Sequence, residues 1–295
     1  MFRIYDTRTG QVEDVSLEPG GVLRVYARGP VPGRPAHFGE LRSLLVADLI
    51  LRNAEHRHGL TVVACLVVPG AGNDEPPAGD ATALNIRPAQ RTMPAPEPAD
   101  KGLGAEPADK GLGAEPAGPV IGALGPAEII LEARLRPAAG QATVWRTVGV
   151  GPVTFAGRDA DGRAPHEEPV VSLSALTDRG LDPLAVRLAL MSRHHGEPAD
   201  LTWDVLADAD QTLRRWRGLV AGWAESPSKP MCAEVTAQVA AAFDGDLDTP
   251  EALRALRGLE QDPQIPPGSK FESFLHADQL LALDLPREIG RPPRG

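Results

Sequence analysis

The sequence predicts an α/β domain with a parallel sheet, followed by an α-helical bundle. Three observations carry this prediction. Residues 21–68 follow a strand, helix, strand pattern, a segment rich in proline, glycine and alanine comes next, and capped amphipathic helices dominate after residue 178. Because parallel strands need a long crossover between them, usually a helix, the first pattern indicates a βαβ unit with a right-handed crossover.

The βαβ unit begins with the alternating segment "GVLRVYA" at Gly21–Ala27, which is rich in residues that favour strands. A helix is expected over Gly39–His58, with one apolar face formed by Leu41, Leu44, Leu45 and Leu49. The next segment, Leu60–Val68, is continuously apolar, as expected of a parallel strand that is covered on both faces. We therefore expect residues 1–68 to form the first half of the α/β domain.

Residues 69–126 differ in character. The nine-residue unit "EPADKGLGA" occurs twice in tandem, at Glu97–Ala105 and Glu106–Ala114. A unit so poor in large apolar residues cannot bury a core, so we predict a disordered linker rather than a repeat module.

Order is expected to resume over residues 127–177, the second half of the α/β domain. Segment 127–136 predicts a strand or a short helix, Ala142–Gly157 predicts two short strands, and Gly157–Pro169 predicts a polar loop. A helical bundle is expected over residues 178–285, followed by a tail at 286–295. Its helices are predicted at Asp182–Arg193 with Asp182 as N-cap, Thr202–Ala224, Met231–Gly245, and Asp246–Glu260 with Thr249 as N-cap.

Composition limits the classes of function. The 295 residues are 42% hydrophobic, enough for one large domain or two ordinary ones. The net charge of -10 argues against a general nucleic-acid surface, so we expect no DNA partner. No apolar run reaches membrane-spanning length and the N-terminus lacks a signal segment, so no membrane partner is expected. Cys65 and Cys232 are far apart, which favours a reducing, cytoplasmic location.

The candidate functional site is the loop between the first strand and the first helix. Gly29 and Pro30 leave the strand, and His37 and Gly39 flank the start of the helix. A helix N-terminus offers unpaired N–H groups and a partial positive charge, glycine lets a phosphate approach the backbone, and imidazole can donate a hydrogen bond. The pattern predicts a phosphate site, although a histidine before a helix is more often a cap or a surface residue.

Five segments carry recognisable motifs: Arg3–Pro30, His37–Arg52, Asp80–Gln90, Leu181–Trp203 and Phe243–Leu256. Together they resemble the cysteinyl-tRNA synthetase family of class I aminoacyl-tRNA synthetases. In that order they resemble the family's N-terminal strand with its Cys-Gly-Pro segment, its His-Ile-Gly-Asn signature, its Asp-Ala-Leu-Asn-Val segment, its Asp-Pro helix and its Asp-Asp-Leu-Asn-Thr-Pro helix start. The order of the segments is that of the family.

The resemblance implies a Rossmann-like class I catalytic domain plus a helical bundle, with ATP bound at Gly29, Pro30, His37 and Gly39. The family activity is ATP-dependent activation of cysteine and its ligation to tRNA. The mycothiol cysteine ligase is equally similar: it shares the fold, lacks the anticodon-binding domain and joins cysteine to an amino-sugar. The length of the helical region fits this second relative better, because the family's anticodon-binding end has no counterpart here.

Two departures from the family concern its chemistry. Arg28 stands where the family has a zinc-binding cysteine, and the stretch with the other zinc ligands has no counterpart, so we expect no zinc. The second signature, Lys-Met-Ser-Lys-Ser in the family, aligns with Gly162–His166, that is Gly162, Arg163, Ala164, Pro165 and His166. Arg163 is the only permanent cation there, and Glu167 and Glu168 follow it. No catalytic residue is assigned.

Two classes of function remain open at this point. One is a catalytically impaired synthetase or ligase. The other is a non-catalytic pseudo-synthetase that binds a nucleotide, a tRNA acceptor or a protein partner, and the charge changes favour it. Two further clusters have structural interpretations: His194, His195 and Glu197 as a helix end rather than a metal pair, and Asp244, Asp246 and Asp248 as helix-capping acids rather than calcium ligands.

Overall fold

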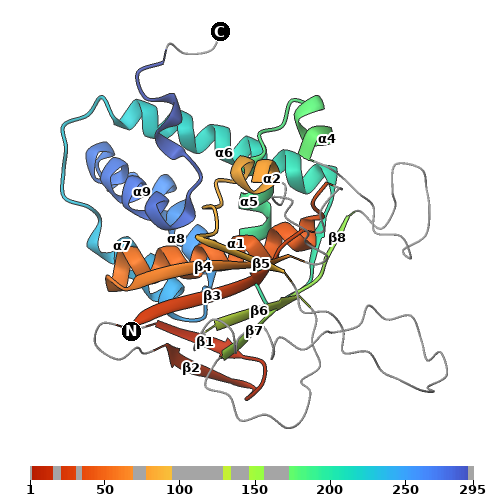
Figure 1. Ribbon diagram of the computed structural model, residues 1–295. Coiled ribbons are helices and arrows are strands. Elements are labelled where there is room, and N and C mark those ends of the chain that lie inside the picture. The colour runs from red at the N-terminus through yellow and green to blue at the C-terminus, as the bar shows by residue number, and fades with distance from the viewer. Residues whose placement is uncertain are drawn as a thin grey trace, which may run out of the picture.

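The computed structural model describes residues 2–15, 21–30, 35–68, 78–94, 129–133, 146–155 and 173–291. In the view of Figure 1 the helical part lies above a sheet, and a two-stranded hairpin lies below it. The tandem repeat and the second-signature positions Gly162, Arg163 and His166 lie outside the described residues.

The α/β part is built on a five-stranded parallel sheet in the order β5-β4-β3-β6-β7. The strands are β3 Val22–Arg28, β4 Thr61–Val68, β5 Arg91–Pro94, β6 Ile129–Ala133 and β7 Arg146–Val150. The chain starts in the centre, adds two strands on one side and then two on the other, which is the order of doubly wound Rossmann folds. The predicted α/β class with a parallel sheet is therefore confirmed.

Helix α1 Phe38–Arg52 joins β3 to β4 and continues as a π-helical turn, η1 Asn53–Arg57. The sequence pattern predicts one apolar face, but the helix is buried almost all round, because it lies between the sheet and the helical part (Figure 1). Leu41 is fully buried, and so are the charged side chains of Arg42 and Asp48, each at most 2% exposed. Such a helix needs polar partners inside the protein.

The predicted linker, residues 69–126, is wrong over 78–94. This stretch forms helix α2 Ala78–Ala83 and the edge strand β5. A carboxylate oxygen of Asp80 accepts a hydrogen bond from the N–H of Ala36 at 3.1 Å, and β5 pairs with β4. Composition alone missed these elements because they are only six and four residues long, so neither shows a clear apolar period.

The helical part surrounds a core in which the ring of Trp216, fully buried, meets Phe274 edge to face at 5.5 Å. A short parallel pair, β8 Val153–Phe155 and β9 Ala199–Leu201, connects it to the α/β part. The helices are α4 Leu173–Asp178, α5 Leu184–Met191, α6 Trp203–Trp223, α7 Ala233–Asp244, α8 Thr249–Gln261, α9 Pro267–Leu281 and the 3-10 turn η2 Leu285–Glu288. Helix α9 lies within the predicted bundle, residues 178–285, although its own bounds were not predicted, and η2 lies mostly within the predicted tail, residues 286–295.

Two predicted N-caps are shifted by one residue. Asp248, not Thr249, caps α8 with an oxygen that accepts a backbone N–H at 3.1 Å. The hydroxyl of Thr249 donates instead to the carbonyl of Met191 at 2.8 Å. At α5 the N-cap is Pro183 rather than Asp182. The predicted helices themselves are present, and the two shifted caps change only the residue at which each helix begins.

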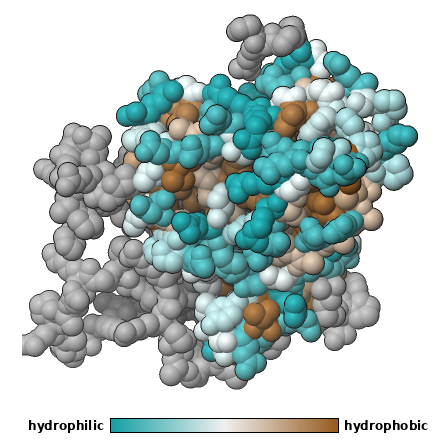
Figure 2. Space-filling view, turned by 180° about the vertical axis from the view of Figure 1, so that it is seen from behind, coloured by the Kyte–Doolittle hydropathy of each residue, from teal (hydrophilic) through white to brown (hydrophobic). Residues whose placement is uncertain are grey.

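The hairpin of β1 Phe2–Asp6 and β2 Gln11–Val15 lies beside β7, where the N–H of Thr7 donates to the carbonyl of Thr147 at 2.8 Å. Seen from behind, the described surface is mainly hydrophilic, with apolar residues in small separate groups (Figure 2). None of the described helices is long and apolar enough to span a bilayer.

Candidate functional site

The candidate site lies at the carboxyl end of β3, where the strand order reverses between β3 and β6. Open α/β sheets bind ligands at this position. Here the N–H of Gly29 donates to the carbonyl of Val67 at 2.7 Å, which keeps the chain beside β4 after β3 has ended. A Cβ on Gly29 would lie 3.0 Å from the side chain of Leu66, so the close approach of the two segments favours glycine.

The other side of the site is the N-terminus of α1. His37 is the N-cap, with an extended backbone, and its carbonyl accepts the first helical hydrogen bond from Leu41 at 2.9 Å. Gly39 lies in the first turn, and a Cβ built on it meets no atom of the described residues within 4 Å. The backbone of Gly39 therefore borders open space, as a phosphate approach requires.

Glu40 changes the charge of this helix start. Its carboxylate reaches back and accepts a hydrogen bond from the N–H of His37 at 2.9 Å, as in a capping box. The negative charge stabilises the helix, but it opposes the partial positive charge that would attract a phosphate. The sequence carries a signal for this role, because the family signature has asparagine where this chain has Glu40.

Two neighbouring segments contact the start of α1 from opposite sides. Asp80 accepts from the N–H of Ala36, directly before His37, at 3.1 Å. On the other side the ring of Phe38 packs 6.2 Å from Phe155. These contacts fix the start of α1 to α2 and β8.

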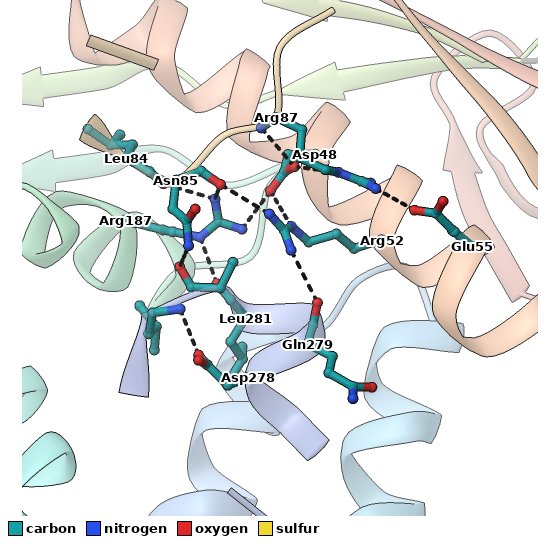
Figure 3. A network of polar contacts seen from close by, with 12 residues as sticks. Asp48, Arg52, Glu55, Leu84, Asn85, Arg87, Arg187, Asp278, Gln279 and Leu281 are labelled. Carbon is teal, nitrogen blue, oxygen red and sulfur yellow. Dashed lines mark hydrogen bonds and ion pairs between the residues drawn. The ribbon is translucent and has the colours of Figure 1, made fainter. Parts of the chain in front are cut away.

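Behind the turn, α1 carries a buried charge network centred on Asp48 (Figure 3). Its carboxylate accepts hydrogen bonds from Arg187 at 2.7 Å, Arg52 at 2.8 Å and Arg87 at 3.3 Å. Burial alone would raise the pKa of Asp48, but the charges of Arg187 and Arg52 outweigh it and lower the pKa below its ordinary value. The carboxylate is therefore ionised in the folded protein.

Arg187, on α5, is fully buried and extends this network. It donates to the carbonyl of Leu281 at 2.6 Å and to that of Leu84 at 3.1 Å, while the side-chain amide of Asn85 donates to the carbonyl of Ala282 at 3.0 Å. Asp48, Asn85 and Arg187 come from three different segments that carry the family resemblance. They meet here as a structural junction between the sheet and the helical part.

Arg42 forms a second junction on α1. Its guanidinium donates to the backbone carbonyls of Glu197 at 2.6 Å, His194 at 2.8 Å and Gly151 at 3.0 Å. Burial lowers the pKa of Arg42 to about 10, so the group remains charged at neutral pH. Arg42 thus ties the loop after α5 to the end of β7.

The predicted site residues fall into two groups. Gly29 and Pro30 lie at the end of β3, and His37 and Gly39 lie at the start of α1. Both are positions at which a nucleotide binds in folds of this strand order. Their role in binding ATP stays a prediction, as does the role of the second-signature positions, which lie outside the described residues.

The chain is similar to a set of curated ligases. It is 38% identical over 120 residues to the L-cysteine:1D-myo-inositol 2-amino-2-deoxy-alpha-D-glucopyranoside ligase of Mycolicibacterium smegmatis, a match that covers 39% of this chain and 28% of that ligase. It is 39% identical over 122 residues to the ligase of the same name from Segniliparus rotundus, with the same two shares. The match thus spans less than a third of these relatives. No family model matches the chain.

Two solved structures are also similar. A putative arginyl-tRNA synthetase from Campylobacter jejuni gives a TM-score of 0.47 at 11% identity, with 90% of each chain covered. A complex of LeuRS, tRNA and LeuAMS from Agrobacterium radiobacter K84 gives 0.36 at 17% identity, with 49% of this chain and 21% of that chain covered. Both TM-scores are below 0.5, so the fold of this chain is assigned from its own strand order.

The names of the matching ligases agree with the family that the sequence resembles, and the doubly wound strand order agrees with the fold which that resemblance implies. The predicted recognition is therefore confirmed. By sequence similarity the chain is class I aminoacyl-tRNA synthetase-like, with cysteine ligases among the proteins that it resembles.

Proposed function

We propose that this protein binds an adenine nucleotide weakly at the start of α1 and does not activate cysteine. The observation that carries the proposal is the position of Gly39. Its backbone borders open space in the first turn of a 15-residue helix, beside the point where the strand order reverses. The helix N–H groups and dipole favour phosphate there by about 1 kcal/mol.

The charges around this position support binding without turnover. Adenylate formation places negative charge on the phosphates, and enzymes meet it with fixed cations. The four lysines of this chain are Lys101, Lys110, Lys229 and Lys270, and none lies between β3 and α1 or in the second-signature segment. The first turn of α1 carries Glu40 instead. Losing one such cation typically costs a hundredfold or more in rate.

The second candidate is an active ATP-dependent cysteine ligase. The specific observation in its favour is the name and similarity of the relatives described above. Against it stands Arg28 at the end of β3, since a guanidinium cannot ligate zinc. In another version of the non-catalytic proposal, the protein binds a tRNA acceptor or a protein partner rather than a small molecule.

ATP–pyrophosphate exchange separates the two candidates. The purified chain is incubated with ATP, labelled pyrophosphate and each of a panel of amino acids, with an active cysteinyl-tRNA synthetase as the positive control. The proposal expects exchange at the level of the blank for every amino acid. Cysteine-dependent exchange above the blank would contradict the proposal and support the active cysteine ligase instead.

A further inference from the structure

A separate group of side chains lies where the N-terminal strand meets two loops of the helical part. His194 and His195 follow α5, and Asp246 lies between α7 and α8. One nitrogen from each imidazole and one carboxylate oxygen lie within 4.8 Å of one another. Among the residues that the structure describes, no other set of three His, Cys, Asp or Glu side chains converges in this way.

The spacing of these atoms is that of metal ligands. The Nε2 of His194 lies 3.4 Å from one carboxylate oxygen of Asp246, and the Nε2 of His195 lies 3.1 Å from the other. A tetrahedral zinc ion with bonds of about 2.0–2.1 Å holds its ligand atoms about 3.3 Å apart. The three side chains can therefore close on an ion with little movement of the backbone.

Both histidines also contact the backbone of Asp246: the Nε2 of His194 lies 3.0 Å and that of His195 3.1 Å from its carbonyl oxygen. The two imidazole rings lie 4.3 Å apart, tilted by 36°, and both direct Nε2 toward Asp246. His195 is only 6% exposed, and its Nδ1 has no hydrogen-bond partner among the described residues, so Nε2 is the ring nitrogen that takes part in the group with Asp246.

The backbone presents Asp246 in an unusual conformation. Asp246 and the following Leu247 both have positive φ, +65° and +51°, which L-residues rarely adopt. One carboxylate oxygen also accepts the N–H of Tyr5 at 2.7 Å, so the side chain is held from a second element. Strained conformations of this kind persist where the surrounding structure fixes them, and they are frequent at functional sites.

The group borders a cavity of about 430 Å³. His194, His195 and Asp246 line it together with Thr7, Gly151 and other residues of the hairpin and of β7. An ion held by the three side chains would keep coordination positions open toward this space, as catalytic and exchangeable zinc sites do, whereas structural sites are closed by four protein ligands.

We propose that His194, His195 and Asp246 bind a divalent transition-metal ion, with zinc as the best match, through two imidazole nitrogens and one carboxylate oxygen. Two nitrogens and one oxygen suit zinc better than magnesium or calcium, which prefer oxygen ligands alone. The site is distinct from the position of Arg28, at the end of β3. With three protein ligands the ion exchanges readily, so a protein purified with chelator holds no stoichiometric zinc.

The test is a titration of the full, tag-free chain with Zn²⁺ in calorimetry and with Co²⁺ in visible absorption, where low-coordinate cobalt gives a strong signature. We expect one ion per chain. His194→Gln removes one ligand at a residue that is 28% exposed, and it should weaken binding by at least about tenfold. His56→Gln, at an exposed histidine of η1, is the matched control and should bind as the native chain does. Cys232→Ser removes the half-buried thiol as a competing ligand.

Stability gives an independent measurement. At a hundredfold excess of Zn²⁺ over its Kd, the Tm of the native chain should rise by roughly 5–10 °C. His194→Gln should show a native circular dichroism spectrum without metal and a much smaller rise with it. The absence of saturable binding would overturn the proposal, and so would equal affinity in His194→Gln and the native chain. Neither result affects the nucleotide site at α1.

Discussion

Gly39 and Glu40 are adjacent residues with opposite effects on the candidate site. Gly39 leaves the backbone open to a phosphate, and Glu40 places a carboxylate in the same helical turn. The sequence pattern predicted the role of Gly39, because that role depends only on the absence of a side chain. It did not predict the effect of the glutamate, because a first-turn acid is normally interpreted as a helix-stabilising residue.

Gly39→Ala should weaken ATP binding without destabilising the fold. The added Cβ meets no protein atom within 4 Å, and alanine favours a helix over glycine by up to about 1 kcal/mol. The methyl group would nevertheless occupy the space that a phosphate needs. Gly258→Ala is the matched control, since Gly258 lies on the exposed side of α8 and also has open space. Calorimetry with ATP and thermal unfolding of both variants check this, and equal ATP affinity in the two would contradict it.

Glu40→Gln should strengthen ATP binding by roughly three- to tenfold, because it removes a negative charge from the first turn while the amide oxygen can still accept from His37. Glu234→Gln makes the same chemical change in the first turn of α7, and it should leave the affinity unchanged. The effect should shrink as salt is added. A decrease in affinity for Glu40→Gln would show that phosphate does not bind at this turn.

At the scale of elements, residues from the segments that carry the family resemblance contact one another in the buried charge network. Asp48 on α1, Asn85 after α2 and Arg187 on α5 lie far apart in the sequence and converge on one network (Figure 3). The sequence shows that these segments resemble a family, but it does not show that they touch. Their roles follow only from the three-dimensional arrangement.

Arg187→Met should destabilise the protein by about 3–5 kcal/mol, because it leaves Asp48 buried with its closest partner removed. Arg254→Met is the control. Arg254 is 69% exposed on α8 and pairs with Glu251, and its loss should cost about 1 kcal/mol or less. Urea unfolding at neutral pH measures both. Similar values for the two variants would mean that the buried network contributes little.

The elements that sequence patterns predicted are those with a clear apolar period or an uninterrupted apolar run, such as β3, β4, α1 and α6. Helix α9 was missed because Ser269, Lys270 and Ser273 are among its buried residues, so no clean apolar stripe marks it. Lys270 can be buried because its Nζ donates to the carbonyl of Glu260 at 2.8 Å. Helix α2 and strand β5 were missed because they are six and four residues long, too short to show a clear apolar period.

At the scale of the whole molecule, ionised carboxylates couple stability to pH. The pKa of Asp48 and that of Asp182 both lie below the ordinary value: burial opposes ionisation in each, and Arg187 or Arg217 outweighs it. A group with a depressed pKa contributes stability above its unfolded pKa and loses it as the pH falls through the folded pKa. Stability should therefore be level from about pH 7 to 5 and fall steeply below about pH 4.

Urea midpoints across this pH range check the acid prediction. Arg187→Met should flatten the acid fall, because the pKa of Asp48 then loses the charge that lowers it. The opposite trend, with stability rising as the pH falls below 4, would contradict the assignment of these carboxylates as ionised. The sequence could supply the net charge of -10 but not these pairings.

A calorimetric titration of the native chain with ATP tests the central claim most directly, in buffer with and without cysteine. The account predicts one weak site with a Kd of roughly 0.1–1 mM, identical heats with and without cysteine, and no continuing heat of reaction. Binding with a Kd of about 1 μM, or continuing heat that depends on cysteine, would contradict it in favour of an active ligase. No binding heat at any ATP concentration would also contradict the account, because the start of α1 would then bind no nucleotide.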